Sequence, residues 1–238
     1  MVRAIAPHLA RDGVLICLQN GLGNVECASE ILGASRVLGA RVIFGAERVR
    51  PGHVRVTVNA APVLVGSPDP DDAGRRAHAV EWAARFDDAG IPSTATDNLV
   101  GELWAKVFYN AALNPLGALL GVPYGYLADD PDARALMDEA IDEAFAVARA
   151  ADVRLAWPDA AAYRTTFYER LVPPTAAHRS SMLQDLERGR PTEIDAINGY
   201  VARRGAALGV PTPVNATLAH MIRARVRRAR RDERPCSP

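Results

Sequence analysis

The chain has 238 residues, of which 49% are hydrophobic and 24% charged, a balance typical of soluble globular proteins with one large domain or two small ones. Its 28 basic and 28 acidic residues cancel, so net charge favours neither a nucleic acid nor an anionic membrane as partner. No apolar stretch approaches the roughly 18 residues of a membrane span, and we expect no signal peptide. Three scattered cysteines fit a reducing cytoplasm, and five histidines without HExxH spacing give little support for a metal site.

The first 96 residues alternate strand and helix patterns. We expect strands at 14–18, 37–46, 53–59, 63–66 and 91–96, and helices at 2–11, 24–32 and 71–89. Pro51-Gly52 marks the turn between two of the strands. The loop 19–24 (QNGLGN) joins the first strand to a helix, but position 26 is a glutamate, so the loop does not complete a GxGxxG phosphate motif.

After residue 97 the pattern becomes helical, and no convincing strand remains. We expect helices at about 97–120, 131–150, 159–170, 174–188, 191–208 and 213–231. Asp130 is placed to cap a helix that begins at Pro131. The expected fold class is therefore α/β plus all-α: a sheet domain at 1–96, followed by a helical domain at 97–238.

The helix around residues 103–115 carries the strongest chemical signal. Lys106 is the only lysine beside 27 arginines, and Lys106, Asn110 and Asn114 are spaced by four residues, so they share one helix face. An ammonium and two carboxamides on an apolar helix must reach solvent or face a polar cleft. A lysine that extends to solvent and two ordinary polar positions are the alternative. Pro115 lacks an N–H, frees the carbonyl of Ala111 and should kink the helix.

A second cluster is formed by Ser180, Ser181 and Glu193. Ser181 and Glu193 lie twelve residues apart across a Gly189–Pro191 turn, so we expect them on consecutive helices that bring them face to face. Taken alone, the pattern favours the simpler interpretation, in which the two serines cap a helix and Glu193 complements the dipole of the next one.

Together these segments resemble the ketopantoate reductase (2-dehydropantoate 2-reductase) family. The matching stretches are VLICLQNGLGN, LWAKVFYNAALNPLGALLG, SSMLQDLERGRPTEIDAINGYV and GVPTPVN, in order along nearly the whole chain. The resemblance implies an NADPH-binding Rossmann domain joined to a helical domain, and the reduction of a 2-keto acid to a 2-hydroxy acid on the way to pantothenate.

The resemblance also implies a role for each matching residue. Lys106 matches the catalytic lysine, the general acid at the ketone, and Glu193 matches the glutamate that orients the substrate and the lysine. Asn110, Asn114 and Ser181 match substrate-binding residues, and Asn20 matches an asparagine near the nicotinamide. Lysine suits this chemistry because it can stabilise the developing oxyanion and then donate a proton, whereas arginine keeps its proton.

The chain departs from the family at its start. About 75–80 residues of a member, with the GxGxxG loop, have no counterpart here, roughly one mononucleotide-binding half of the sheet. The resemblance therefore makes residues 1–96 an incomplete Rossmann-like sheet domain, followed by a helical domain at 97–238. A misplaced start codon, a genuinely shortened paralogue and a separate polypeptide that supplies the missing half are the three alternatives. We expect weak or absent NADPH binding and little activity from the chain as given.

Two other functions compete with the reductase. The first is a non-catalytic helical binding or dimerisation module derived from such an enzyme, and a homodimer is expected by analogy with the family. The second is nucleic-acid binding through residues 223–234, which carry seven arginines; the segment has no aromatic residues to stack on bases, so we expect no nucleic-acid partner. The expected substrate is a small 2-keto acid with a polar tail.

Overall fold

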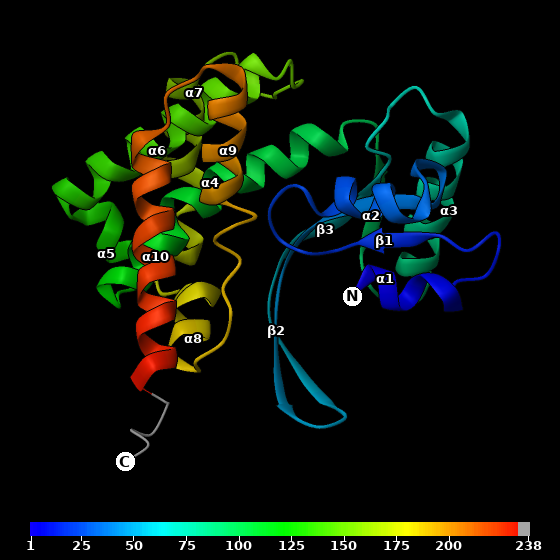
Figure 1. The fold of residues 1–238 in the computed structure, drawn as a ribbon, viewed down its shortest axis with the longest axis horizontal. Coiled ribbons are helices and arrows are strands. Elements are labelled where there is room, and N and C mark those ends of the chain that lie inside the picture. The colour runs from blue at the N-terminus through cyan, green and yellow to red at the C-terminus, as the bar shows by residue number, and fades with distance from the viewer. Residues whose placement is uncertain (233–238) are drawn as a thin grey trace. The chain divides into compact units, whose positions relative to one another are not determined.

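The computed structural model describes the backbone of residues 1–232 and the side chains of 1–46, 49–56 and 61–228. The chain divides into two compact units, Met1–Leu103 and Trp104–Pro238. The division falls inside one long helix, α4 (Leu99–Leu120), which is labelled in Figure 1.

The first unit is built on a mixed four-stranded sheet. Its elements are α1 (Val2–Ile5), β1 (Leu15–Cys17), α2 (Asn24–Leu32), β2 (Val37–Arg50), β3 (His53–Gly66), α3 (Ala73–Asp88) and β4 (Ser93–Thr96). The strand order is β1-β2-β3-β4; β1 and β2 pair in parallel, β2 and β3 antiparallel, and β3 and β4 in parallel. The α/β pattern expected for this half is confirmed.

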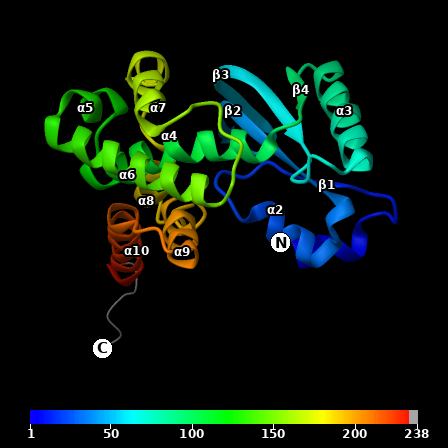
Figure 2. The ribbon, with the colours of Figure 1, turned by 90° about the horizontal axis from the view of Figure 1, so that it is seen from above.

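Alternate side chains of the strands face two separate apolar cores. Leu38 and Ala40 of β2 pack with Val63 and Val65 of β3 against α3. Val37, which precedes Leu38 in β2, packs on the other face, with residues of β1 and α2. Because neighbouring residues of a strand point to opposite faces, α2 and α3 cover opposite sides of the sheet (Figure 2).

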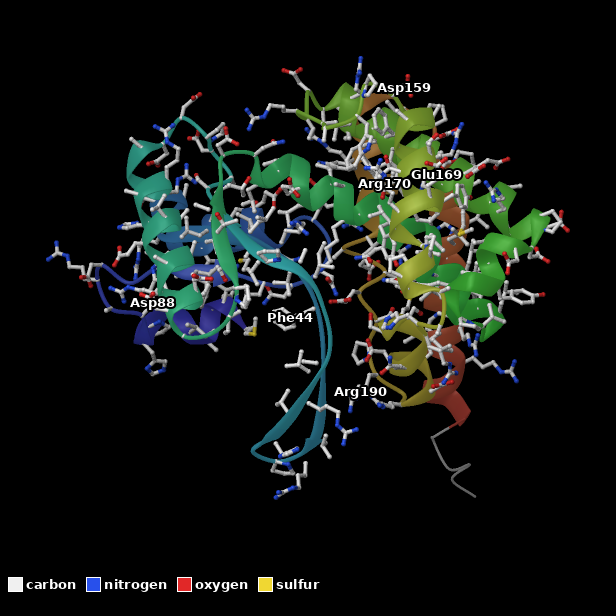
Figure 3. All side chains as sticks on the ribbon, turned by 180° about the vertical axis from the view of Figure 1, so that it is seen from behind. Phe44, Asp88, Asp159, Glu169, Arg170 and Arg190 are labelled. Carbon is white, nitrogen blue, oxygen red and sulfur yellow. The ribbon has the colours of Figure 1, made fainter. Side chains whose placement is uncertain are left out.

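Strands β2 and β3 form a long ribbon (Figure 1). The prediction of two separate strands at 53–59 and 63–66 is wrong, because β3 runs unbroken from His53 to Gly66. Its partner β2 extends along this whole length. Pro62 cannot donate a hydrogen bond to β2, and the register shifts around Ile43 accommodate it. Phe44, labelled in Figure 3, lies on this ribbon and is exposed.

The second unit is helical. It comprises the rest of α4, then α5 (Tyr124–Asp129), α6 (Pro131–Ala150), α7 (Ala160–Thr166), α8 (Ser181–Glu187), α9 (Asn198–Leu208) and α10 (Pro213–Asp232). A π-helical turn, Phe167–Leu171, continues α7, and a 3-10 turn covers Pro173–Thr175. No strand lies after β4 in the described part of the chain, as expected.

Capping residues account for several helix starts in this unit. Asp130 accepts a hydrogen bond from the N–H of Ala133 at 2.8 Å, so α6 begins after it as predicted. Asp159, labelled in Figure 3, caps α7 in the same way through Ala162. Two predicted starts are wrong: the helix expected at 174 begins at Ser181, and the helix expected at 191 begins at Asn198. The short helix α5 was not predicted.

None of the helices in the described residues is long and apolar enough to cross a bilayer. The predicted final helix is confirmed as α10, which ends at Asp232. The last two residues of the basic segment 223–234, and Cys236, lie outside the described residues.

Candidate active site

Helix α4 carries Lys106, Asn110 and Asn114 on one face. The helix is continuous from Leu99 to Leu120, so the spacing of four residues places the three side chains in one row, as predicted. The side chain of Asn98 accepts from the N–H of Gly101 at the start of the helix. Apolar side chains of the same segment are buried as well: Trp104, Val107, Phe108, Ala111 and Leu113. Val107 and Leu113 flank the polar row, and Asn110 and Asn114 are themselves buried, so this segment is enclosed on all sides.

Asn110 has a buried amide group without a partner. Its side chain is 7% exposed, and Nδ2 makes no hydrogen bond to any described residue. A buried donor without an acceptor costs about 1–3 kcal/mol, so such groups are rare in stable folds. Asn110 Nδ2 could therefore donate a hydrogen bond to a ligand that reaches the row.

Asn114 is anchored on two sides. Its Oδ1 accepts a hydrogen bond from the hydroxyl of Tyr124 at 2.7 Å, and its backbone carbonyl accepts one from Ser180 Oγ at 3.3 Å. Ser180 is also the cap of α8, because its Oγ accepts from the N–H of Leu183 at 3.1 Å. The start of α8 is therefore attached directly to the polar row of α4.

Ser181 and Glu193 lie near helix starts, but not as predicted. Ser181 is the first residue of α8 and is exposed, whereas the buried cap is Ser180. Glu193 is not on a helix: it opens a turn that precedes α9, in which the N–H of Ala196 donates to the carbonyl of Glu193 at 3.0 Å. The backbone of Ile197 is not helical (φ −107°, ψ −103°), and this separates the turn from α9.

The carbonyl freed by Pro115 has a partner from a distant helix. Asn198 Nδ2 donates to the oxygen of Ala111 at 3.0 Å and to Asn215 Oδ1 at 2.9 Å. Asn215 Nδ2 in turn donates to Glu143 Oε2 at 2.8 Å. The carboxylate of Glu143 also accepts the N–H groups of Val214 and Asn215 at the start of α10. One buried chain of hydrogen bonds thus joins α4, α9, α10 and α6.

Asn20 lies in the first unit, in the loop that follows β1. Its carbonyl accepts a hydrogen bond from Asn24 Nδ2 at 3.0 Å. Gly21 and Gly23 of this loop have φ of 85° and 88°, a conformation that favours glycine. A cavity of about 160 Å³ borders the loop, and Leu15, Gln19 and Asn24 are among the residues that line it.

Sequence reasoning missed the residues that support the row. Tyr124 lies on a helix that was not predicted, Glu143 showed no local signal, and Asn215, the last residue of the matching stretch GVPTPVN, carried no assigned role. Asn198 could have been sought, because a freed carbonyl at Ala111 requires a donor from elsewhere in the fold. Among the described residues, no three His, Cys, Asp or Glu side chains gather as a metal site would require.

Two family models match the chain. The model described as "Ketopantoate reductase PanE/ApbA C terminal" matches residues 98–226, and "Ketopantoate reductase PanE/ApbA" matches residues 1–69. Among curated relatives, a 2-dehydropantoate 2-reductase of Aquifex aeolicus is 40% identical over 224 residues, which are 94% of this chain and 71% of the relative. That of Archaeoglobus fulgidus is 35% identical over 216 residues, 89% of this chain and 67% of the relative.

Solved structures show the same fold. A PanE/ApbA family ketopantoate reductase from Ralstonia eutropha is 35% identical with a TM-score of 0.83, over 96% of this chain and 72% of that one. D-mandelate dehydrogenase, solved with NADH and anilino(oxo)acetate, is 25% identical with a TM-score of 0.84, over 96% of this chain and 72% of that one. By both sequence and fold, the chain belongs to the ketopantoate reductase family of oxidoreductases.

Proposed function

We propose that the protein reduces 2-dehydropantoate (ketopantoate) to pantoate with NADPH, a step toward pantothenate. The observation that carries the proposal is the polar row on α4, in which Lys106 stands beside the unsatisfied amide of Asn110. Relatives named 2-dehydropantoate 2-reductase support the substrate, and the NADH complex of D-mandelate dehydrogenase supports a nicotinamide cofactor. The choice of NADPH over NADH comes from the family resemblance.

Lys106 is the proposed general acid. When bound, the nicotinamide cofactor supplies the hydride that the carbonyl carbon of the substrate accepts. Negative charge then develops on the carbonyl oxygen, and the ammonium of Lys106 stabilises this charge and donates a proton to it. An arginine could stabilise the charge but could not give up its proton at neutral pH.

The remaining residues of the site hold the substrate. Asn110 and Asn114 offer amide N–H groups to its oxygen atoms, and Asn110 Nδ2 would gain the acceptor it lacks. Ser181, exposed at the first turn of α8, would donate to the carboxylate of the substrate or to the hydroxyl beside it. Glu193, partly buried in the turn before α9, would orient the substrate and Lys106.

The loop around Asn20 fits the nicotinamide end of the cofactor. Gly21 and Gly23 leave its backbone open at the carboxyl end of β1, where ligands of open α/β sheets bind, and a cavity borders it. Glu26, in the first turn of α2, would repel a pyrophosphate but not the neutral reduced nicotinamide ring. Asn20 is accordingly assigned to the nicotinamide and not to the phosphates.

The test is a titration followed by an assay. NADPH is added to the full chain and binding is followed by its fluorescence; ketopantoate is then added and the loss of reduced nicotinamide is recorded. Saturable binding with turnover supports the reductase, and parallel measurements with NADH define the cofactor preference. Weak NADPH binding alone is expected, because the sequence lacks a GxGxxG loop, and it leaves the proposal standing. A folded chain that does not bind ketopantoate would contradict the proposal and favour a non-catalytic binding module.

We extend the proposal to a cytoplasmic homodimer, in line with the family resemblance. Sedimentation equilibrium over a range of concentrations measures the oligomeric state directly. A monomer at all concentrations would contradict the dimer without affecting the proposed chemistry.

A further inference from the structure

The hydroxyl of Tyr124 is positioned to control Asn114. Tyr124 is the first residue of α5, its side chain is 3% exposed, and its hydroxyl lies 2.7 Å from Asn114 Oδ1. Asn114 is itself 3% exposed, so water does not compete effectively for this bond. The family resemblance assigned no role to this tyrosine.

The ring of Tyr124 is held from several directions. Its backbone N–H donates to the carbonyl of His178 at 3.1 Å, and its ring contacts the imidazole of His178 at a tilt of 59°, with centroids 5.3 Å apart. Tyr109 meets the same ring edge-on at 6.0 Å and 83°. The hydroxyl of Tyr109 is engaged with Thr175 Oγ1 at 2.6 Å, so Tyr109 is held as well. The phenol therefore approaches Asn114 from a fixed direction.

A tyrosine hydroxyl in this position acts as a donor. Burial, with a smaller contribution from Tyr109, raises the pKa of the Tyr124 phenol, so it keeps its proton at physiological pH. Its proton requires an acceptor, and only the oxygen of the Asn114 carboxamide can accept it. The Nδ2 group of Asn114 therefore points away from the Tyr124 hydroxyl.

We propose that Tyr124 is a positioning residue, which fixes the Asn114 carboxamide so that it presents its N–H group to the substrate. The inference rests on the proposed function. Asn110 Nδ2 and the Lys106 ammonium are donors on the same face of α4, so the Nδ2 group of Asn114 adds a third donor to the row. Three such donors favour a ligand rich in acceptor oxygens, such as a 2-keto or 2-hydroxy acid.

A double-mutant cycle tests the inference in the full chain. Tyr124→Phe removes the hydroxyl and keeps the ring; we expect ketopantoate to bind about fivefold to tenfold more weakly, the effect of losing one oriented hydrogen bond. NADPH affinity should not change. In an Asn114→Ala background, Tyr124→Phe should have no further effect, because the tyrosine acts only through Asn114.

Tyr168→Phe is the matched control. Its hydroxyl also donates to a side-chain oxygen, that of Asp138 at 2.6 Å, and it lies in the same unit. We expect unchanged ketopantoate affinity in this variant. Wild-type affinity in Tyr124→Phe, or an equal loss with and without Asn114, would overturn the inference.

A second measurement keeps the inference separate from the proposed function. The side-chain amide signals of Asn114 in a ¹⁵N-labelled, ligand-free chain report the orientation of its carboxamide whether or not ketopantoate binds. We expect these signals to shift or broaden in Tyr124→Phe and to stay unchanged in Tyr168→Phe. Unchanged signals in Tyr124→Phe would overturn the positioning role, whereas a wild-type chain that fails to bind ketopantoate contradicts only the proposed function.

Discussion

Asn198 donates its side-chain amide to the carbonyl oxygen of Ala111 at 3.0 Å, across 87 residues of sequence. This carbonyl would accept the N–H of residue 115 in an ordinary helix, but Pro115 has none. Asn198 is fully buried and replaces the missing donor. Helix α4 therefore continues through its proline because another helix completes its hydrogen bonding, next to Asn110 and Asn114.

Asn198→Ala should destabilise the helical unit by about 2–4 kcal/mol, because it leaves the Ala111 carbonyl and Asn215 Oδ1 buried without a donor. Pro115→Ala supplies an N–H to the same carbonyl, so in that background the loss should be smaller by about 1–2 kcal/mol. Urea unfolding of the four proteins of this cycle measures both values. Equal losses in the two backgrounds would show that Asn198 does not act through Ala111.

The regular elements were predictable because their signals are local. The turn at Pro51-Gly52 and the cap at Asp130 are visible in a few neighbouring residues, and both are confirmed. The unbroken course of β3 was not visible, since it depends on pairing with β2 along its whole length. The start of α9 was missed for a related reason: Asn198 takes part in hydrogen bonds to α4 and α10, which no local pattern reveals.

For the site, the helical spacing of four was sufficient to place Lys106, Asn110 and Asn114 on one face. The spacing could not show that Tyr124 donates to Asn114, because Tyr124 lies beyond the end of α4, on a helix that was not predicted. The prediction that Glu193 lies on a helix is wrong, because backbone hydrogen bonds after Pro191 form a separate turn there. The catalytic and binding roles of these residues stay predictions.

Glu143→Gln should destabilise the helical unit by about 1–3 kcal/mol. The carboxylate accepts the N–H groups of Val214 and Asn215, and a glutamine would point an amide group at one of them. Loss of the negative charge at the start of α10 acts in the same direction. Thermal and urea unfolding test this, with Glu139→Gln on the exposed side of the same helix as control. Equal stability of the two variants would contradict the assigned role of Glu143.

Asn110→Leu should stabilise the fold and impair the site. The substitution removes a buried amide whose Nδ2 has no partner among the described residues, so we expect a gain of about 1 kcal/mol in unfolding free energy. Ketopantoate affinity should fall in the same variant. Asn215→Leu is the matched control, because both hydrogens of that amide are bonded, and it should lower stability instead. A loss of stability in Asn110→Leu would mean that its amide serves the fold and not a ligand.

Lys106→Arg separates charge from proton donation. Arginine keeps a positive charge on α4, so ketopantoate should bind within about tenfold of the wild-type affinity, but it cannot give up its proton at neutral pH. We expect kcat to fall about 10²–10⁴-fold, the usual contribution of a general acid. Lys106→Met removes charge and proton together and should weaken binding as well. Binding by calorimetry and turnover by nicotinamide absorbance must therefore diverge in the arginine variant. Unchanged turnover in Lys106→Arg would exclude Lys106 as the proton donor and leave it the electrostatic role alone.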